Sequence, residues 1–270
     1  MSQHTSPPKS LYKYLSPKRA AKFFERPALR FTPAAELNDI FELNPHIEEF
    51  FLIKKFLQEF GEYYDASLLN RANNLGKFLQ TETGVLSLSS IPDSLLMWAH
   101  YCEKHEGFVV ELDTESQFFK PEPDMQHLFW DLEKTTYSKD RPSISILKTV
   151  ESKPKEMWSL FFLPVFFAKS EDWSYEEEWR FIAPHISKLD PTTGDDGCAL
   201  SGLILLPVSA IKSVILGART NQSHFKQALA FSRKHKIPTR RAVPDAHRFA
   251  LNIIDINDSF QDCVGPDGLP

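Results

Sequence analysis

The residues best suited to chemistry are concentrated between Trp173 and Arg180, where the sequence reads WSYEEEWR. We expect this segment to enter a strand in which Glu176 and Glu178 point to one face and Trp179 to the other. Two carboxylates on one face can stabilise a developing cation and orient or deprotonate a nucleophile. The flanking aromatic residues favour a partly buried pocket floor. An exposed acidic edge, with Arg180 paired across the strand, is the alternative interpretation.

A second group is the segment MWAHY at residues 97–101, followed by His105. If this segment is helical, Trp98 packs in the core while His100 and Tyr101 border a cleft. His100 and His105 then lie about 140° apart around the helix axis, which disfavours a zinc pair on the helix. A lone histidine is more often structural than functional, so both interpretations of His100 stand.

Polar side chains also occur on two expected strands. Ser87 and Ser89 share one face of the strand LSLSS at residues 86–90, and serines in an apolar strand need partners, which predicts a cleft wall. The sequence has no GxSxG motif to support a serine nucleophile. Tyr12 and Tyr14 share a face of the first strand, where they can stack on a ligand ring or pack in the core.

Strands and helices that must position these side chains alternate irregularly along the chain. No regular strand–helix–strand order and no GxGxxG motif after a strand is present, which argues against a doubly wound nucleotide fold. We expect one α+β domain over residues 1–270, with a mixed or antiparallel central sheet, flanking helices, a helical insertion at about 46–80 and irregular ends at 1–10 and 259–270. The expected strands are residues 11–15, 29–32, 85–90, 108–112, 132–138, 177–183, 203–206, 214–216 and 240–243. The expected helices are residues 16–24, 47–60, 64–80, 94–104, 155–167 and 221–235.

Composition limits the partners of the chain. Hydrophobic residues make up 42% of its 270 residues, and the formal net charge is −5, which disfavours non-specific binding to nucleic-acid phosphates unless a local patch overrides it. One basic cluster, residues 233–241, is better explained as a solvated helix-to-strand corner. The three cysteines form no CxxC pair, which supports neither disulfides nor a cysteine zinc site. With no apolar stretch of 18 residues, we expect a cytoplasmic protein without a membrane partner and without a bound metal.

Six blocks carry a family resemblance. Their order and residue types resemble the bacterial domain-of-unknown-function family 2971, with its MW-HY, H-G and YE-EWR signatures. One departure is Ile40, where the family pattern LNDPFE has proline. The resemblance implies which surface is of interest and no particular reaction. The blocks are LYKYL (11–15), LNDIFE (37–42), LSLSS (86–90), LMWAHYCEKHEGFVVELD (96–113), KSEDWSYEEEWRFI (169–182) and IKSVILG (211–217).

The order of the polar strands is similar to that of the ADP-ribosyltransferase superfamily. There an early basic or polar strand binds dinucleotide, a serine strand lines the nicotinamide pocket, and a late glutamate drives transfer. This similarity implies NAD as substrate and a protein or nucleic-acid acceptor, in a toxin or phage-defence effector. It implies that Glu178 stabilises the oxocarbenium ion and that Glu176 orients the acceptor. We expect Glu178→Gln to abolish activity without unfolding the protein. His100 completes the expected catalytic set, and the residues expected to bind the dinucleotide are Tyr12, Tyr14, Arg30, Ser87, Ser89, Trp98, Tyr101, Tyr175 and Arg180.

Two other classes of function use the same residues. A ligand-sensing or antitoxin-like protein would bind in the aromatic–acidic cleft and consume nothing. A weaker alternative is a metal-dependent nuclease or hydrolase using Glu176, Glu178, Asp113 and His100. The sequence does not specify the oligomeric state.

Overall fold

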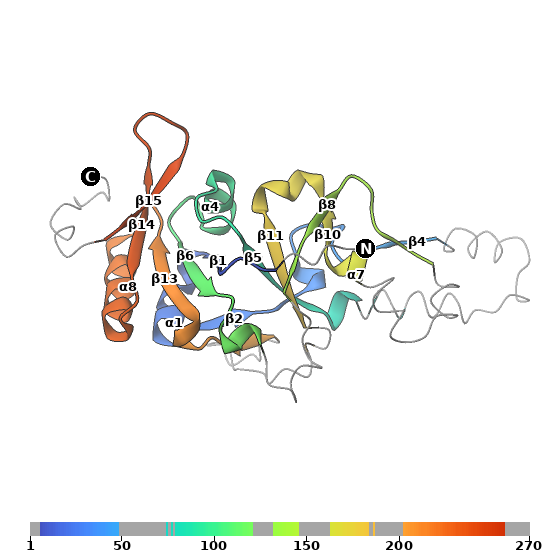
Figure 1. Cartoon of the computed structure of the whole chain (residues 1–270), viewed down its shortest axis with the longest axis horizontal. Helices are drawn as coiled ribbons and strands as arrows, with labels where there is room; N and C mark the ends of the chain where they lie inside the picture. Colours follow the sequence, from blue (N-terminus) through green and yellow to red (C-terminus); the bar gives the residue numbers. More distant parts are fainter. Residues whose placement is uncertain are drawn as a thin grey trace, which may run out of the picture.

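A nine-stranded sheet forms the centre of the molecule in the computed structural model, which describes residues 6–48, 74, 77, 79–120, 132–145, 163–183, 186 and 202–256 (Figure 1). The strand order is β15-β14-β13-β6-β1-β5-β11-β7, and β3 also pairs with β5. Its strands are β1 (Ser10–Leu15), β3 (Thr32–Pro33), β5 (Gly84–Ser89), β6 (Phe108–Asp113), β7 (Glu133–Lys134), β11 (Glu178–Ala183), β13 (Ile211–Leu216), β14 (Thr239–Pro244) and β15 (Leu251–Asp255).

Shorter elements surround this sheet. Three two-stranded sheets pair β10 (Ala168–Ser170) with β8 (Thr136–Ser138), β12 (Leu203–Leu205) with β2 (Ala28–Arg30), and β4 (His46–Ile47) with β9 (Ser143–Ile144). The α-helices are α1 (Ala20–Glu25), α4 (Leu95–Tyr101), α7 (Leu163–Phe166) and α8 (Gln222–His235). The 3₁₀ helices are η1 (Pro17–Arg19), η2 (Ala34–Glu36), η4 (Gln117–Phe119), η7 (Glu171–Glu176) and η9 (Val208–Ala210).

The predicted α+β class is confirmed. Neighbouring strands of the central sheet are antiparallel except β13 and β14, which are parallel and joined through α8. Most of the expected helical insertion, and the outermost residues of both ends, lie outside the described residues. The helix expected at residues 94–104 ends earlier, at Tyr101, because Glu103, Lys104 and His105 have φ values of 44°, 59° and 71° and therefore form a left-handed turn.

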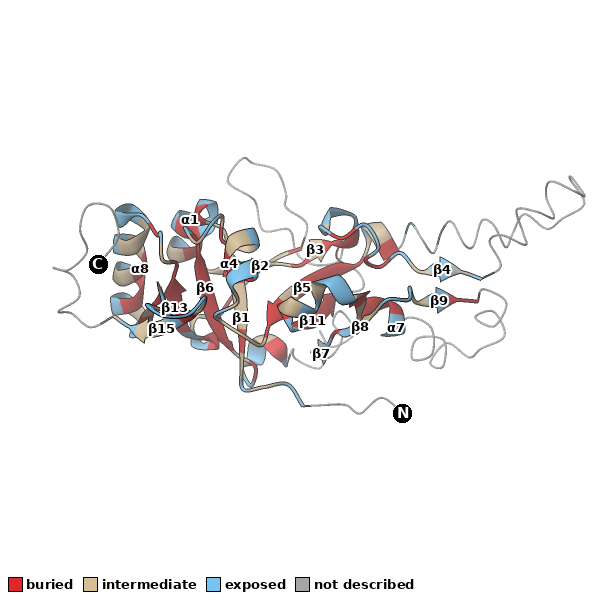
Figure 2. Cartoon of the chain, turned by 90° about the horizontal axis from the view of Figure 1, so that it is seen from above, coloured by how far each residue is buried: buried red, intermediate tan, exposed pale blue. Residues whose placement is uncertain are grey.

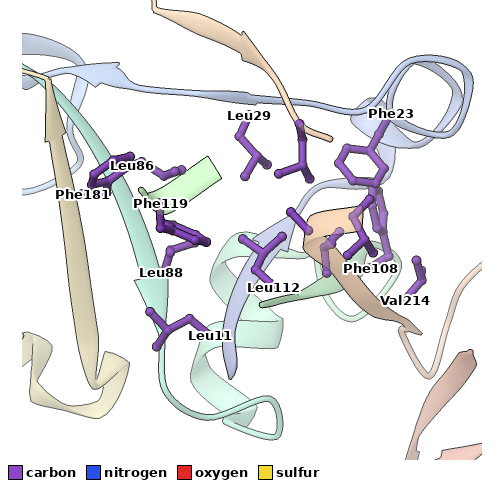
Figure 3. Packing of buried hydrophobic residues seen from close by; sticks show 14 of the residues in the cluster. Leu11, Phe23, Leu29, Leu86, Leu88, Phe108, Leu112, Phe119, Phe181 and Val214 are labelled. Atoms are coloured by element: carbon purple, nitrogen blue, oxygen red, sulfur yellow. The ribbon is translucent and has the colours of Figure 1, made fainter. Parts of the chain in front are cut away.

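Helices cover both faces of the sheet, so the central strands are buried on both sides (Figure 2). In β6, Phe108 and Val110 belong to the cluster beneath α1 and α8, whereas Val109 belongs to the cluster beneath α4. This two-sided burial explains why the strand reads FVVELD without a polar alternation. Figure 3 shows the first cluster, in which the rings of Phe23, on α1, and Phe108 lie 5.4 Å apart in a tilted arrangement. No helix among the described residues is long and apolar enough to cross a membrane.

The sheet divides between β1 and β5. β1 pairs with β6 over six residues, but with β5 through the single pair Tyr12 and Ser89. β5 in turn pairs with β11 over six residues, with Ser89 opposite Glu178. Tyr12, Ser89 and Glu178 therefore form one row across three neighbouring strands. Beyond this row, β1 and β5 no longer form a ladder, and their polar groups need other partners.

Candidate functional site

A pocket of about 250 Å³ lies where the sheet divides. β1 and β5 form one wall, the loop after η2 and the end of α4 form another, and a buried cluster of charged side chains lies at the base. The described residues that line it are Tyr12, Lys13, Tyr14, Thr32, Glu36, Leu37, Asn38, Glu42, Ser87, Leu88, Ser89, Met97, Tyr101, Lys169, Glu176 and Glu178.

Lys169 is the centre of the buried charged cluster. Its Nζ lies 2.5 Å from Glu176 Oε2, 3.2 Å from Glu178 Oε2 and 3.1 Å from Glu42 Oε1. All four side chains are at most 4% exposed. Burial lowers the pKa of the ammonium, but the three carboxylates outweigh it and the pKa of Lys169 is raised. The amine is therefore a permanent cation that holds three acids together.

Arg180 completes this cluster from behind the pocket. Its guanidinium donates to Glu178 through Nε at 3.0 Å and Nη2 at 2.9 Å, and Nη2 also contacts Glu42. Burial raises the pKa of Glu178, but the charges of Arg180 and Lys169 outweigh that effect and hold the pKa at about 2. Glu178 is thus an ionised carboxylate that is locked between two cations.

Glu176 and Glu178 lie close together, but they do not belong to one strand as expected. Glu178 and Arg180 share a face of β11, as strand alternation predicts. Glu176, however, ends η7, and Glu177 between them has a left-handed backbone with φ of 42°. The prediction that Glu176 and Glu178 lie on one strand is wrong, because this turn precedes the strand. Their carboxylates still contact the same ammonium of Lys169.

Tyr101 connects the cluster to the pocket. Its hydroxyl donates to Glu176 Oε1 and accepts a hydrogen bond from Asn38 Nδ2 at 2.9 Å. Burial and the negative charge of Glu176 both raise the pKa of the Tyr101 hydroxyl. Tyr101 therefore remains a neutral donor at physiological pH and fixes the orientation of the carboxylate.

Lys13 lies on the pocket wall where β1 and β5 separate. Its Nζ donates to the carbonyl oxygen of Ser87 at 2.8 Å. Burial lowers the pKa of this amine to about 8, although the nearby charge of Glu178 opposes the shift. The cations Lys13, Lys169 and Arg180 balance the acids Glu42, Glu176 and Glu178, but among the described residues Lys13 forms no ion pair.

The segment that runs from α4 into β11 also matches a known protein family. Residues 97–181 match DUF2971, a family described as a protein of unknown function. The resemblance read from the sequence is confirmed for this segment. The DUF2971 segment contains Tyr101, Lys169, Glu176, Glu178 and Arg180, so it supplies most of the cluster. Comparisons with curated proteins and with solved structures gave no match.

Seven of the predicted site residues meet at the pocket, three of them from the DUF2971 segment and four from the strands before it. They are Tyr12, Tyr14, Ser87, Ser89, Tyr101, Glu176 and Glu178. Ser89 Oγ donates to the Glu176 carbonyl at 2.7 Å, so this serine also ties the strand to the end of η7. Arg180 does not line the pocket but orients Glu178.

Four other predicted residues lie outside the pocket lining. Trp98 is 0% exposed, and its indole donates to the Pro92 carbonyl, so this residue of the DUF2971 segment packs in the core. Arg30 is on β2, outside the central sheet, and forms a two-point ion pair with Glu36 at 2.7 and 2.8 Å. His100 and Tyr175 contact each other at 3.1 Å on the exposed side of α4.

The pocket residues that were not identified from the sequence include three with charged side chains, Lys13, Glu42 and Lys169. Glu42 and Lys169 stand in the LNDIFE and KSEDW blocks, so the family resemblance marked their positions without assigning them a role. Lys13 was assigned no role because strand alternation places it opposite Tyr12 and Tyr14. Only the division of the sheet gives its amine access to the pocket.

The residues expected for metal-assisted hydrolysis are not brought together. In the parts of the chain that the structure describes, no three His, Cys, Asp or Glu side chains could hold a metal ion. Asp113 Oδ1 accepts from the backbone of Glu115 at the far end of β6, while Glu176 and Glu178 are bound by Lys169. The carboxylates therefore have cationic partners from the protein itself.

The lowered pKa of Lys13 predicts a pH-dependent stability. Between pH 8 and the ordinary lysine value of 10.5, the unfolded chain binds more protons at this site than the folded protein. The contribution of Lys13 to the free energy of unfolding must therefore rise with pH across this window. We expect Lys13→Met to remove that rise, as measured by comparing melting temperatures of the two proteins from pH 7 to 10. If the melting temperatures of the two proteins changed in parallel with pH, the Lys13 amine would be freely solvated in the folded protein.

Proposed function

We propose that this protein cleaves the bond between nicotinamide and ribose in NAD, as an ADP-ribosyltransferase or an NAD glycohydrolase. The row of Tyr12, Ser89 and Glu178 across three neighbouring strands carries the proposal. These residues come from the early polar strand, the serine strand and the late glutamate strand, in the order that the superfamily resemblance implies. All three line one pocket.

The chemistry requires a fixed negative charge beside the anomeric carbon. When the C1′–N bond breaks, the electron pair leaves with neutral nicotinamide and C1′ becomes an oxocarbenium ion. An ionised carboxylate that is already oriented stabilises this cation without reorganising. Glu178 has that property because Arg180 and Lys169 hold it ionised. Water or an acceptor hydroxyl then adds to C1′, and its proton is released through Glu176, whose cationic partner among the described residues is Lys169.

The remaining pocket residues suit one half of a dinucleotide. A volume of about 250 Å³ is below the roughly 300–1,000 Å³ of pockets that enclose whole drug-sized ligands, so the rest of NAD would extend outside. Tyr12 and Tyr14 offer aromatic surface, and the Lys13 ammonium is a cation on the first strand suited to a phosphate. Lys13 thus takes the place that the sequence assigned to Arg30.

One observation favours a second candidate, a ligand-sensing protein that binds in this pocket without turnover. The oxygens of Glu178 already accept hydrogen bonds from Arg180 and Lys169. Such saturated carboxylates shape a binding site well but have little capacity left for a reacting substrate.

The test measures two quantities separately: nicotinamide release from NAD, with and without cell extract as acceptor, and NAD binding by calorimetry. We expect Glu178→Gln, assayed at 10 °C where it remains folded, to bind NAD but release at least a hundredfold less nicotinamide. Glu177→Gln, the same change on the exposed neighbour, should match the wild type. NAD binding without release by the wild-type protein would assign the ligand-sensing function. If the wild-type protein neither binds NAD nor releases nicotinamide, both proposals are overturned.

A further inference from the structure

A second pocket lies at the opposite side of α4 from the central one. It has a volume of about 490 Å³ and lies between the start of α4, the turn after β13 and the connection from β14 to β15. Figure 1 shows this connection projecting beyond the sheet near α4. We call it the hairpin pocket; its lining residues are Leu95, His105, Ala218, Arg219 and residues 244–251.

The hairpin pocket carries positive charge that no ion pair among the described residues neutralises. Arg219 and Arg248 are both exposed, and within the described ranges neither has an ion-pair partner. The Arg219 backbone N–H donates to the His105 carbonyl at 3.0 Å, which holds these two lining residues next to each other. The lining thus combines two arginines with His105 and the exposed His247.

The one acid among the lining residues serves the turn itself. Asp245 Oδ1 accepts from the backbone N–H groups of His247 and Arg248 at 2.8 and 2.9 Å, and Oδ2 accepts from Asn252 at 3.0 Å. These bonds hold the connection in a defined shape. Asp245 therefore fixes the backbone of the turn that carries Arg248 and Phe249, and among the described residues it forms an ion pair with neither arginine.

Phe249 supplies an aromatic surface next to these charges. Its side chain is 101% exposed, and Leu95 across the pocket is 39% exposed. An isolated exposed phenylalanine needs no explanation, but Phe249 lines the same pocket as Arg219 and Arg248, and this pocket is large enough for a planar ring. Guanidinium groups bind phosphates and aromatic faces stack on bases, which is the combination used to bind single strands.

From these contacts we infer that the hairpin pocket binds single-stranded nucleic acid, with a base against Phe249 and the adjoining phosphates on Arg219 and Arg248. A lipid surface would require a broader apolar patch than Phe249 and Leu95 provide. The basic cluster at the other end of β14 is a poorer site, because Arg240 is paired with Glu111 and Asp255 and Arg241 donates to the Ala218 carbonyl. The net charge of −5 disfavours binding elsewhere on the surface. This inference is independent of the chemistry proposed for the central pocket.

The test is fluorescence anisotropy of a labelled oligothymidylate at several salt concentrations, with the intact chain. We expect Phe249→Ala to weaken binding about tenfold, the usual effect of losing one stacked base. Arg219→Ser combined with Arg248→Ser should reduce the slope of log K against log salt by about 1.4, or 0.7 for each phosphate contact. Because all three side chains are exposed, the variants should melt like the wild type.

The matched control is Lys226→Ser combined with Lys234→Ser, which removes two charges from exposed positions of α8. It should leave affinity and salt slope nearly unchanged. Equal weakening by the control would mean that the attraction is diffuse, and this would overturn the inference. So would absence of binding in low salt, binding to duplex DNA alone, or binding to anionic vesicles instead of the oligonucleotide.

Discussion

Glu178→Gln should lower the free energy of unfolding by about 3–5 kcal/mol, the usual loss when one partner of a buried ion pair is removed. The substitution keeps the shape of the side chain but removes its charge. Lys169 and Arg180 are then left with fewer counterions in a site where all these side chains are at most 4% exposed. The sequence alone led us to expect that this variant folds normally, whereas the burial of Glu178 in the structure predicts a large loss of stability.

Urea unfolding of the two proteins measures this difference. Glu177→Gln is the matched control, since it makes the same change on an exposed side chain whose contact is a hydrogen bond from Ser90 Oγ at 2.7 Å. That variant should stay within about 0.5 kcal/mol of the wild type. If Glu178→Gln were equally neutral, Glu178 would have to be hydrated in solution, and the buried cluster would not exist as described.

The pH dependence gives a second check on the same residue. The pKa of Glu178 in the folded protein, about 2, is below the ordinary value of 4.5. A carboxyl with a lowered pKa contributes stability above the unfolded value and loses it as the pH falls toward the folded value. The stability difference between wild type and Glu178→Gln should therefore narrow as the pH falls from 4.5 toward 2. If the difference in the free energy of unfolding stayed constant over this pH range, the substitution would destabilise the protein through packing and not through charge.

Local patterns in the sequence were sufficient to predict most of the fold. Asn221 predicts the start of α8, where its side chain accepts from the His224 backbone N–H, and the apolar run FVVEL predicts β6. Tyr12 and Tyr14 pack in one cluster, and Leu86 and Leu88, which alternate with Ser87 and Ser89, pack in another. Strand alternation predicts this arrangement because it depends only on neighbouring residues.

Features that depend on distant pairings could not be predicted. Glu42 reaches Arg180 from 138 positions away, and no local pattern indicates this contact. The division between β1 and β5 depends on where the ladder between them stops, and this division alone gives Lys13 access to the pocket. The end of helix α4 could not be predicted either, because three residues with left-handed backbone, including His105, follow the helix.

Trp98→Ala should also lower the free energy of unfolding by about 3–5 kcal/mol, because it leaves a cavity in the core. The indole is 0% exposed and lies edge-on to Tyr14 at a ring distance of 5.6 Å. Its Nε1 donates to the Pro92 carbonyl at 2.8 Å, a bond that alanine also removes. Urea unfolding measures the loss, and His100→Ala, an exposed change on the same helix, should be close to neutral.

Comparison with Tyr101→Phe separates packing from pocket chemistry on this helix. Trp98 and Tyr101 are three residues apart and therefore lie on the same side of α4, yet only Tyr101 reaches Glu176 and lines the pocket. We expect Trp98→Phe to bind pocket ligands like the wild type at a temperature where it is folded, and Tyr101→Phe to bind them more weakly. A Trp98→Phe protein that melted normally but lost ligand binding would show that Trp98 contributes directly to the binding site. A ring confined to the core can influence ligand binding only through the stability of the fold.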